Sequence, residues 1–247
     1  NILLVKLPLK LMKIKHLSNL FKDKRVLITG NTGFKGSWLS LWMIKFGAKV
    51  YGFSKNIPTN PSNFKVLKLN KYVNQTFGDI RNKKNFEKRI IQIKPDFIFH
   101  LAAQAIVKDS YKDPYNTWQT NTFGTINLME SIKKLKKRCT VILITSDKSY
   151  KNLELNRGYH ENDLLGGKDP YSASKASADI AIYSYVNSFF YNSKKIKIAV
   201  ARAGNVIGGG DWTKDRLIPD CFKSWSNKKK IFIRNPNSTR PWQHVLE

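Results

Sequence analysis

The sequence predicts an α/β fold built on a doubly wound parallel sheet. Short apolar segments rich in β-branched residues alternate along the chain with longer segments of helical periodicity. Glycines fill the junction between the first strand and the first helix, and a Ser-Asp-Lys segment follows a buried strand. This alternation favours βαβ units, whose ligands bind at the carboxyl ends of the strands.

The elements are justified in order by their residue patterns. The expected strands span residues 25–29, 49–53, 72–77, 97–100, 139–144 and 196–201, of which 72–77 has the weakest pattern. The expected helices span residues 35–46, 83–93, 117–137 and 171–191. Pro95 ends the second of these, and lysines in the last turns of the third complement the helix dipole. The crossovers between the strands are expected to be right-handed.

Length and composition restrict the classes of protein. A chain of 247 residues, 41% of them hydrophobic, can form one large domain with a substantial core. No apolar run approaches the roughly 18–20 residues of a membrane span. Cys139 and Cys221 lack the spacing of a disulfide framework or a metal site, so we expect no metal and a reducing compartment.

The net charge of +27 has two interpretations. It suits a nucleic acid or an anionic membrane surface. The lysines are scattered through every segment, however, and no arginine-rich stripe occurs, which favours compositional bias. We expect neither a nucleic-acid nor a membrane partner, although anionic small ligands remain compatible with the charge.

Residues 1–21 are predicted to form a basic, apolar N-terminal extension. Pro8 interrupts the extension, and it lacks the small-residue cleavage site of a signal peptide. Met12 is an alternative start, which would make the preceding residues non-native. Attachment of this segment to a membrane is the other interpretation.

The glycine-rich segment predicts a dinucleotide site. Gly30, Gly33 and Gly36 lie between the first strand and the first helix, where they permit a tight turn and let a pyrophosphate approach the helix N-terminus. The acid that usually holds the ribose 2′-hydroxyl is missing, since no Asp or Glu occurs between Asp23 and Asp79.

The choice between NAD and NADP is therefore open from this loop. Ser54 and Lys55 occupy the end of the second strand, where Lys55 would suit a 2′-phosphate. Asp79 follows the third strand and has two possible roles, at the adenine edge of the cofactor or as the N-cap of the next helix.

Tyr171 and Lys175 predict an acid–base pair. Their spacing of four residues places them on one face of a helix. An ammonium group beside a phenol stabilises the phenolate and lowers the tyrosine pKa, so that the pair can accept a proton from an alcohol.

These segments together resemble the extended short-chain dehydrogenase/reductase family. The resemblance rests on the three glycines, on HLAAQ at 100–104, on TNTFGT at 120–125 and on the Tyr-x-x-x-Lys pair. TSDK at 145–148, ahead of PYSASK at 170–175, is similar to the nucleotide-sugar 4,6-dehydratases within it. Five segments look closest to the branch that acts on CDP-glucose: TGNTGFKGSWL, TSDKSYKN, ARAGNVIGGGDW, DRLIPD and RPWQHVLE.

The resemblance covers about residues 22–247 and implies two parts. Residues 22–203 would form the NAD-binding, Rossmann-like domain, and residues 204–247 would begin a sugar-nucleotide-binding domain. Family members continue beyond this point, so we expect the second part to be incomplete. The resemblance also implies a cytoplasmic enzyme of deoxysugar biosynthesis and a homodimer formed through the helices at 117–137 and 171–191.

The implied reaction converts CDP-glucose to its 4-keto-6-deoxy derivative. Tyr171, supported by Lys175, would take the 4-hydroxyl proton while a hydride passes from C4 to NAD. The 4-ketone acidifies C5, water leaves across C5 and C6, and the hydride returns to C6. Ser146 would bond the 4-oxygen, Asp147 would protonate the leaving hydroxyl, and Lys148 would be either the C5 base or a charged stabiliser of the enolate.

Carried over residue by residue, the resemblance gives a set of candidate site residues. The catalytic candidates are Ser146, Asp147, Lys148, Tyr171 and Lys175. The cofactor-binding candidates are Gly30, Gly33, Phe34, Lys35, Gly36, Asp79, Ile80, Leu101, Ala102, Ala103, Gln104, Asn121, Thr145, Tyr171 and Lys175. The substrate-binding candidates are Gln104, Ser146, Asn205, Arg216, Leu217 and Arg240.

Other functions remain as alternatives. One is a different nucleotide-sugar dehydratase or a 4-epimerase, and another is an NAD-binding module without turnover. A charge-driven nucleic-acid binder is a more distant alternative. His100, Trp38 and Trp42 are expected to be packed residues rather than catalytic or ligand-binding ones.

Overall fold

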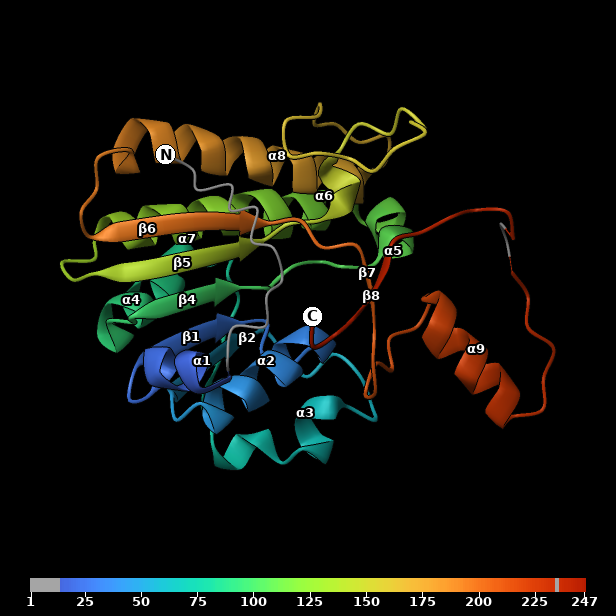
Figure 1. Ribbon diagram of the computed structural model, residues 1–247, viewed down its shortest axis with the longest axis horizontal. Coiled ribbons are helices and arrows are strands. Elements are labelled where there is room, and N and C mark those ends of the chain that lie inside the picture. Colours follow the sequence, from blue (N-terminus) through green and yellow to red (C-terminus); the bar gives the residue numbers. More distant parts are fainter. Residues whose placement is uncertain (1–13, 234–235) are drawn as a thin grey trace.

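The computed structural model describes residues 14–233 and 236–247, and a parallel sheet forms the centre of this part (Figure 1). Its strand order, β3-β2-β1-β4-β5-β6, is that of a doubly wound fold, as predicted. The strands are β1 (Arg25–Thr29), β2 (Lys49–Ser54), β3 (Asn74–Phe77), β4 (Phe97–His100), β5 (Cys139–Ile144) and β6 (Ile196–Ala201). The predicted alternative start at Met12 lies outside the described residues.

Helices cover both faces of the sheet. They are α1 (Ile14–Phe21), α2 (Phe34–Lys45), α3 (Asn63–Val66), α4 (Lys83–Ile93), α5 (Val107–Lys112), α6 (Pro114–Trp118), α7 (Gly124–Lys133), α8 (Pro170–Tyr185) and α9 (Leu217–Ser226). Shorter helical segments are η1 (Leu69–Lys71), η2 (Gln119–Phe123), η3 (Asp147–Ser149) and η4 (Val186–Phe190).

Alternating residues of the strands build a separate core on each face. On β1, Leu27 packs into a core with residues of α4, α7 and α8, while Val26 and Ile28 pack with residues of α1, α2 and α3. Such alternation follows from the two-residue period of a strand. Because both faces are covered, the central strands β1, β4 and β5 are mostly apolar and carry polar groups mainly near their ends, whereas the edge strand β3 is mostly polar.

The two long predicted helices are correct in place but not in form. The helix expected at 117–137 begins earlier as α6, continues through the π-helical segment η2 and ends with α7 at Lys133. The helix expected at 171–191 likewise passes from α8 into a π-helical segment, η4. A π-turn leaves the apolar periodicity nearly unchanged, so the sequence pattern did not reveal it.

The last residues of the predicted N-terminal extension, 14–21, belong to the folded domain in the structure. Residues 14–21 form α1, and Phe21 is buried, with its ring 4.9 Å from that of Phe97 on β4. Leu17 packs partly against the same core. The core of the domain therefore begins before residue 22.

Residues after β6 form a smaller unit. β7 (Asn205–Ile207) and β8 (Trp242–His244) pair in parallel, and α9 stands apart from the layers of the main sheet (Figure 1). Within the described ranges, no helix has the length and apolarity that crossing a bilayer requires. The same part of the chain contains no cluster of side chains suited to a metal ion.

Candidate active site

The carboxyl ends of β1 and β4 are joined by Thr29. Its hydroxyl accepts hydrogen bonds from the backbone N–H groups of Leu101 (3.2 Å) and Ala102 (3.1 Å). It also bonds Nδ1 of His100 at 2.9 Å. These bonds hold the segment Leu101–Ala103 against the glycine loop, at the edge where parallel sheets bind ligands.

The glycine loop has the shape that a dinucleotide needs. Gly30 has a φ of +70°, and a Cβ there would lie 2.8 Å from the nitrogen of Ala102. At Gly36, a Cβ would lie 2.2 Å from the Gly30 carbonyl oxygen. Gly33 caps α2 without any side-chain hydrogen bond, so the first backbone N–H groups of the helix, beginning at Phe34 and Lys35, remain available to an anion. The residues present therefore fit a pyrophosphate-containing cofactor.

Asp79 does not cap the helix that follows it. Arg81 holds its carboxylate with three side-chain hydrogen bonds of 2.6–3.0 Å, while the cap of α4 is Asn82. Hydrogen bonding to Arg81 lowers the pKa of Asp79, despite its partial burial. Lys55 lies 3.7 Å from the same carboxylate, which draws this cation toward Asp79. The side chain of Ile80 is part of the core, so only its backbone could reach a cofactor.

The acid–base pair is fixed by the start of α8. Asp169 caps the helix by accepting hydrogen bonds from the N–H (3.0 Å) and hydroxyl (2.6 Å) of Ser172. Pro170 then occupies the first helical position, so Tyr171 lies in the first turn and Lys175 one turn later. Asp169 is not among the predicted site residues, although Asp-Pro before a helical pattern is a recognisable N-terminal signal.

Burial shifts the pKa values of Tyr171 and Lys175 in opposite directions. It raises the pKa of Tyr171, while a hydrogen bond to Ser146 and the charge of Arg216 oppose the rise. It lowers the pKa of Lys175 to about 8, and the charge of Lys35 acts in the same direction. The expected lowering of the tyrosine pKa is thus not found in the free protein. The ammonium group of Lys175 donates a hydrogen bond to the Ile144 carbonyl at 3.4 Å, at the end of β5.

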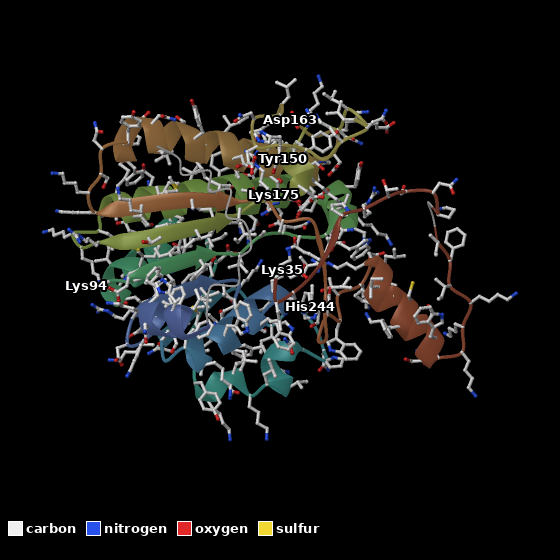
Figure 2. The ribbon with its side chains drawn as sticks, in the orientation of Figure 1. Lys35, Lys94, Tyr150, Asp163, Lys175 and His244 are labelled. Carbon is white, nitrogen blue, oxygen red and sulfur yellow. The ribbon has the colours of Figure 1, made fainter. Side chains whose placement is uncertain are left out.

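The Ser-Asp-Lys segment lies beside this pair. Ser146 is buried; its hydroxyl donates to Asp147 (3.0 Å) and accepts from the N–H of Lys148 (3.2 Å), which starts the short helix η3. The ammonium group of Lys148 is 5.9 Å from the ring centroid of Tyr171. Thr145, just before them, is also buried. The catalytic candidates therefore come together at one edge of the sheet, and Figure 2 shows Lys175 at this edge.

Two candidates have their polar groups occupied by the protein. The Gln104 amide bonds the backbone of Ile106, as donor and as acceptor, and also reaches Thr117. The side chain of Asn121 joins both backbone groups of Gln104 to the hydroxyl of Ser174 on α8. These hydrogen bonds position the segment after β4 against α8, and contact of either side chain with a ligand stays a prediction.

The substrate candidates are spread over the smaller unit. Asn205 begins β7, and Leu217 begins α9 and is exposed. Arg216 is the N-cap residue of α9, without a capping hydrogen bond from its side chain, and it pairs at 3.1 Å with Asp211, a buried carboxylate that is not among the predicted site residues. Arg240 is exposed, and its guanidinium donates only to the neighbouring carbonyl of Thr239 in the described part of the chain. The structure thus brings Arg216, but not Arg240, into the electrostatic environment of Tyr171.

His100, Trp42 and Trp38, which were expected to be packed residues, differ in their surroundings. His100 is buried as expected, and burial lowers its pKa to about 3. Trp42 packs partly against the core, with its ring 6.0 Å from that of Phe46. Trp38 instead donates a hydrogen bond from its indole to the Gly209 carbonyl at 2.9 Å, and so ties α2 to the loop after β7.

Comparison with known proteins agrees with this geometry. The family model described as GDP-mannose 4,6 dehydratase matches residues 27–247. The chain belongs to this dehydratase family. It is 48% identical to the CDP-glucose 4,6-dehydratase of Salmonella typhimurium, across 93% of this chain and 65% of that protein. It is also 30% identical to the dTDP-D-glucose 4,6-dehydratase of Dictyostelium discoideum, across 90% of this chain and 53% of that protein.

Solved structures give the same fold. A dTDP-glucose 4,6-dehydratase from Bacillus anthracis, in complex with NAD, matches with a TM-score of 0.76 and 25% identity, over 91% of this chain and 68% of that one. An epimerase from Methanothermobacter thermautotrophicus matches with a TM-score of 0.80 and 23% identity, over 95% and 68%. This member of the dehydratase family spans about 65% of the length of its Salmonella relative.

Proposed function

We propose that this protein catalyses the NAD-dependent 4,6-dehydration of CDP-glucose to the 4-keto-6-deoxy sugar nucleotide. The observation that carries the proposal is the meeting of Tyr171 and Lys175 on α8 with Ser146, Asp147 and Lys148 after β5. The similarity to a CDP-glucose 4,6-dehydratase supports the choice of nucleotide and sugar. Residues 22–203 would bind the cofactor, and residues 204–247 would begin the substrate-binding part.

NAD would lie along the carboxyl edge of the sheet. When bound, it supplies the hydride acceptor and donor that a 4,6-dehydration requires. The backbone from Gly30 to Gly36 would hold its pyrophosphate, and Ala102, Ala103 and Thr145 would line its path toward Lys175. Asp79 would meet the adenosine half. Its contact with Lys55 favours NAD over NADP, since this cation is drawn to a carboxylate that would repel a 2′-phosphate.

The proton movements fall to the side chains around Tyr171. Tyr171 would accept the proton of the sugar 4-hydroxyl, with Arg216 and Ser146 stabilising its phenolate. Asp147 would donate a proton to the departing 6-hydroxyl. Lys148 would act at C5, as the base that removes its proton or as a cation that stabilises the enolate. Arg216, Asn205, Leu217 and Arg240 would contact the nucleotide.

We also propose a cytoplasmic homodimer that supplies deoxysugars for a surface polysaccharide. The support for the dimer is an apolar strip on the outer face of α8 and its neighbours. Phe123, Ile180, Tyr183 and Phe189 are each about half exposed or more, between 49% and 61%. Exposed apolar strips of this kind mark interfaces more often than free surface.

The test is incubation of the chain with NAD⁺ and, in parallel, CDP-, dTDP-, GDP- and UDP-glucose, followed by mass spectrometry. We expect loss of one water from CDP-glucose alone, and none with Tyr171→Phe. Water loss from another nucleotide sugar would identify that compound as the substrate in place of CDP-glucose. An isomer of unchanged mass would identify an epimerase, and bound dinucleotide without turnover would identify an NAD-binding module.

A further inference from the structure

Lys35 is a cation at the centre of the site. It lies in the first turn of α2 and is partly buried, and in the described part of the chain it forms no ion pair. Its charge interacts with those of Arg216, Asp147 and Asp211, and it acts on Lys175. Figure 2 shows Lys35 and Lys175 both beyond the carboxyl ends of the strands.

Contacts of its neighbours fix which way this turn of α2 faces. Trp38, three residues along, donates to the Gly209 carbonyl at 2.9 Å. The ring of Phe34 lies 3.4 Å from the position that a Cβ on Gly208 would take. The turn therefore packs against the loop after β7, which carries Asp211 and leads to Arg216. The ammonium group of Lys35 lies near enough to this loop to interact with the charges of Asp211 and Arg216, while its backbone belongs to the glycine loop.

The charges around Lys35 do not balance. Around Lys35, three cations, which are Lys35 itself, Lys175 and Arg216, share the region with the two carboxylates of Asp147 and Asp211. Asp179 also acts on Lys175, but it is paired with Arg202. Asp211 is already paired with Arg216. Three minus two leaves an excess of one positive charge. A partly buried cation is costly unless an anion compensates it, and burial accordingly lowers the pKa of Lys35.

We propose that the side chain of Lys35 binds the diphosphate of the nucleotide sugar, together with Arg216. This inference rests on the proposed function and deepens it. The diphosphate would compensate the excess positive charge around Lys35. The pyrophosphate of the cofactor would instead face the backbone N–H groups at the start of α2, so the two anions would use different groups of the same residue.

The experiment is calorimetric titration of Lys35→Met with CDP, cytidine and NADH, with Lys45→Met on the last turn of the same helix as a matched control. We expect Lys35→Met to weaken CDP binding by about tenfold to a hundredfold, the usual loss for a charge-assisted contact. Binding of cytidine and of NADH should change less than about twofold by the same reasoning. Lys35→Arg should recover most of the CDP affinity, and Lys45→Met should bind as the wild type does.

The outcomes separate the inference from the proposed function. Weaker NADH binding with unchanged CDP binding would assign Lys35 to the cofactor and overturn the inference. Equal loss for cytidine and CDP would indicate a structural effect and would also overturn it. If the wild-type chain binds UDP or dTDP in place of CDP, the proposed substrate is wrong, and the same comparison with that nucleotide decides the role of Lys35. A wild-type chain that binds no nucleoside diphosphate would overturn both.

Discussion

Burial dominates the chemistry of single residues in this site. Tyr171 and Lys175 share a helix face, as their spacing predicted, yet burial raises the pKa of the phenol and lowers that of the ammonium group. The spacing of two residues on a helix predicts whether their side chains lie on the same face. How deeply those side chains are buried depends on how the whole edge of the sheet is covered. The same applies to Gln104, whose amide turns to its own loop because Ile106 and Thr117 lie within reach.

Lys148 is the residue whose role the sequence left open. Lys148→Met should reduce exchange of the C5 proton with solvent at least about a hundredfold, whether Lys148 is the base or the stabilising cation. Lys148→Glu should restore exchange only if a base is needed. The measurement is deuterium incorporation at C5, followed by NMR, with the exposed Lys151→Met as control. Unchanged exchange in Lys148→Met would exclude both roles.

His100 should make the fold sensitive to acid. Its pKa is about 3 in the folded protein, below the ordinary value of 6.5, because it is buried near Lys175. At pH values between these two pKa values, the unfolded chain binds more protons than the folded protein does. The free energy of unfolding therefore falls as the pH falls. The loss amounts to about 1.4 kcal/mol for each pKa unit of the shift.

Urea unfolding between pH 7 and pH 4 tests this expectation. His100→Asn should be less stable at pH 7, where it loses the fit to Thr29, but its stability should change less with pH than that of the wild type. The exposed His160→Asn serves as the control. Parallel pH curves for the wild type and His100→Asn would show that the buried imidazole is not the cause.

At the scale of elements, the first βαβ unit shows most directly how sequence dictates a site. The glycine pattern predicted the loop because its backbone leaves no space for side chains, and this constraint is local. The π-helical segments η2 and η4 could not be predicted, since they depend on packing between helices. Asn121 lies in η2, and it is this segment that brings its amide to Ser174 on α8.

Gly36→Ala should disable the cofactor loop. The added Cβ would meet the Gly30 carbonyl at 2.2 Å and the Asn31 Cα at 2.7 Å, both backbone atoms that cannot turn aside. We expect NADH binding to be lost and the free energy of unfolding to fall by about 1–3 kcal/mol, as is usual for overpacking. Fluorescence titration and urea unfolding measure the two effects. Gly158→Ala, with no atom within 4 Å of the new Cβ, should behave as the wild type does; undiminished NADH binding by Gly36→Ala would contradict the loop's role.

At the scale of the whole molecule, α/β alternation predicted the doubly wound sheet and its edge, but not the N-terminal limit of the core. The basic residues of 1–21 suggested a separate extension, whereas the burial of Phe21 against Phe97 depends on a strand far along the chain. The arrangement of residues 204–247 was equally hidden, because β7 pairs with a strand that begins only at Trp242.

The apolar strip on α8 predicts the oligomeric state. We expect a dimer by analytical ultracentrifugation, and a monomer when Ile180 and Tyr183 are both replaced by lysine, because burying two charges would oppose association. Val66→Lys, at another exposed apolar position, is the matched control. A monomeric wild type, or a dimer that persists in the double variant, would contradict the proposed interface.

The central claim, dehydration across C5 and C6 by this site, is tested most directly in heavy water. The chain would be incubated with NAD⁺ and CDP-glucose in D₂O, and the product examined by NMR and mass spectrometry. We predict a product that has lost one water, carries a methyl group at C6 and has gained solvent deuterium at C5. A product that retains all its oxygen, or one that lacks deuterium at C5, would contradict the account.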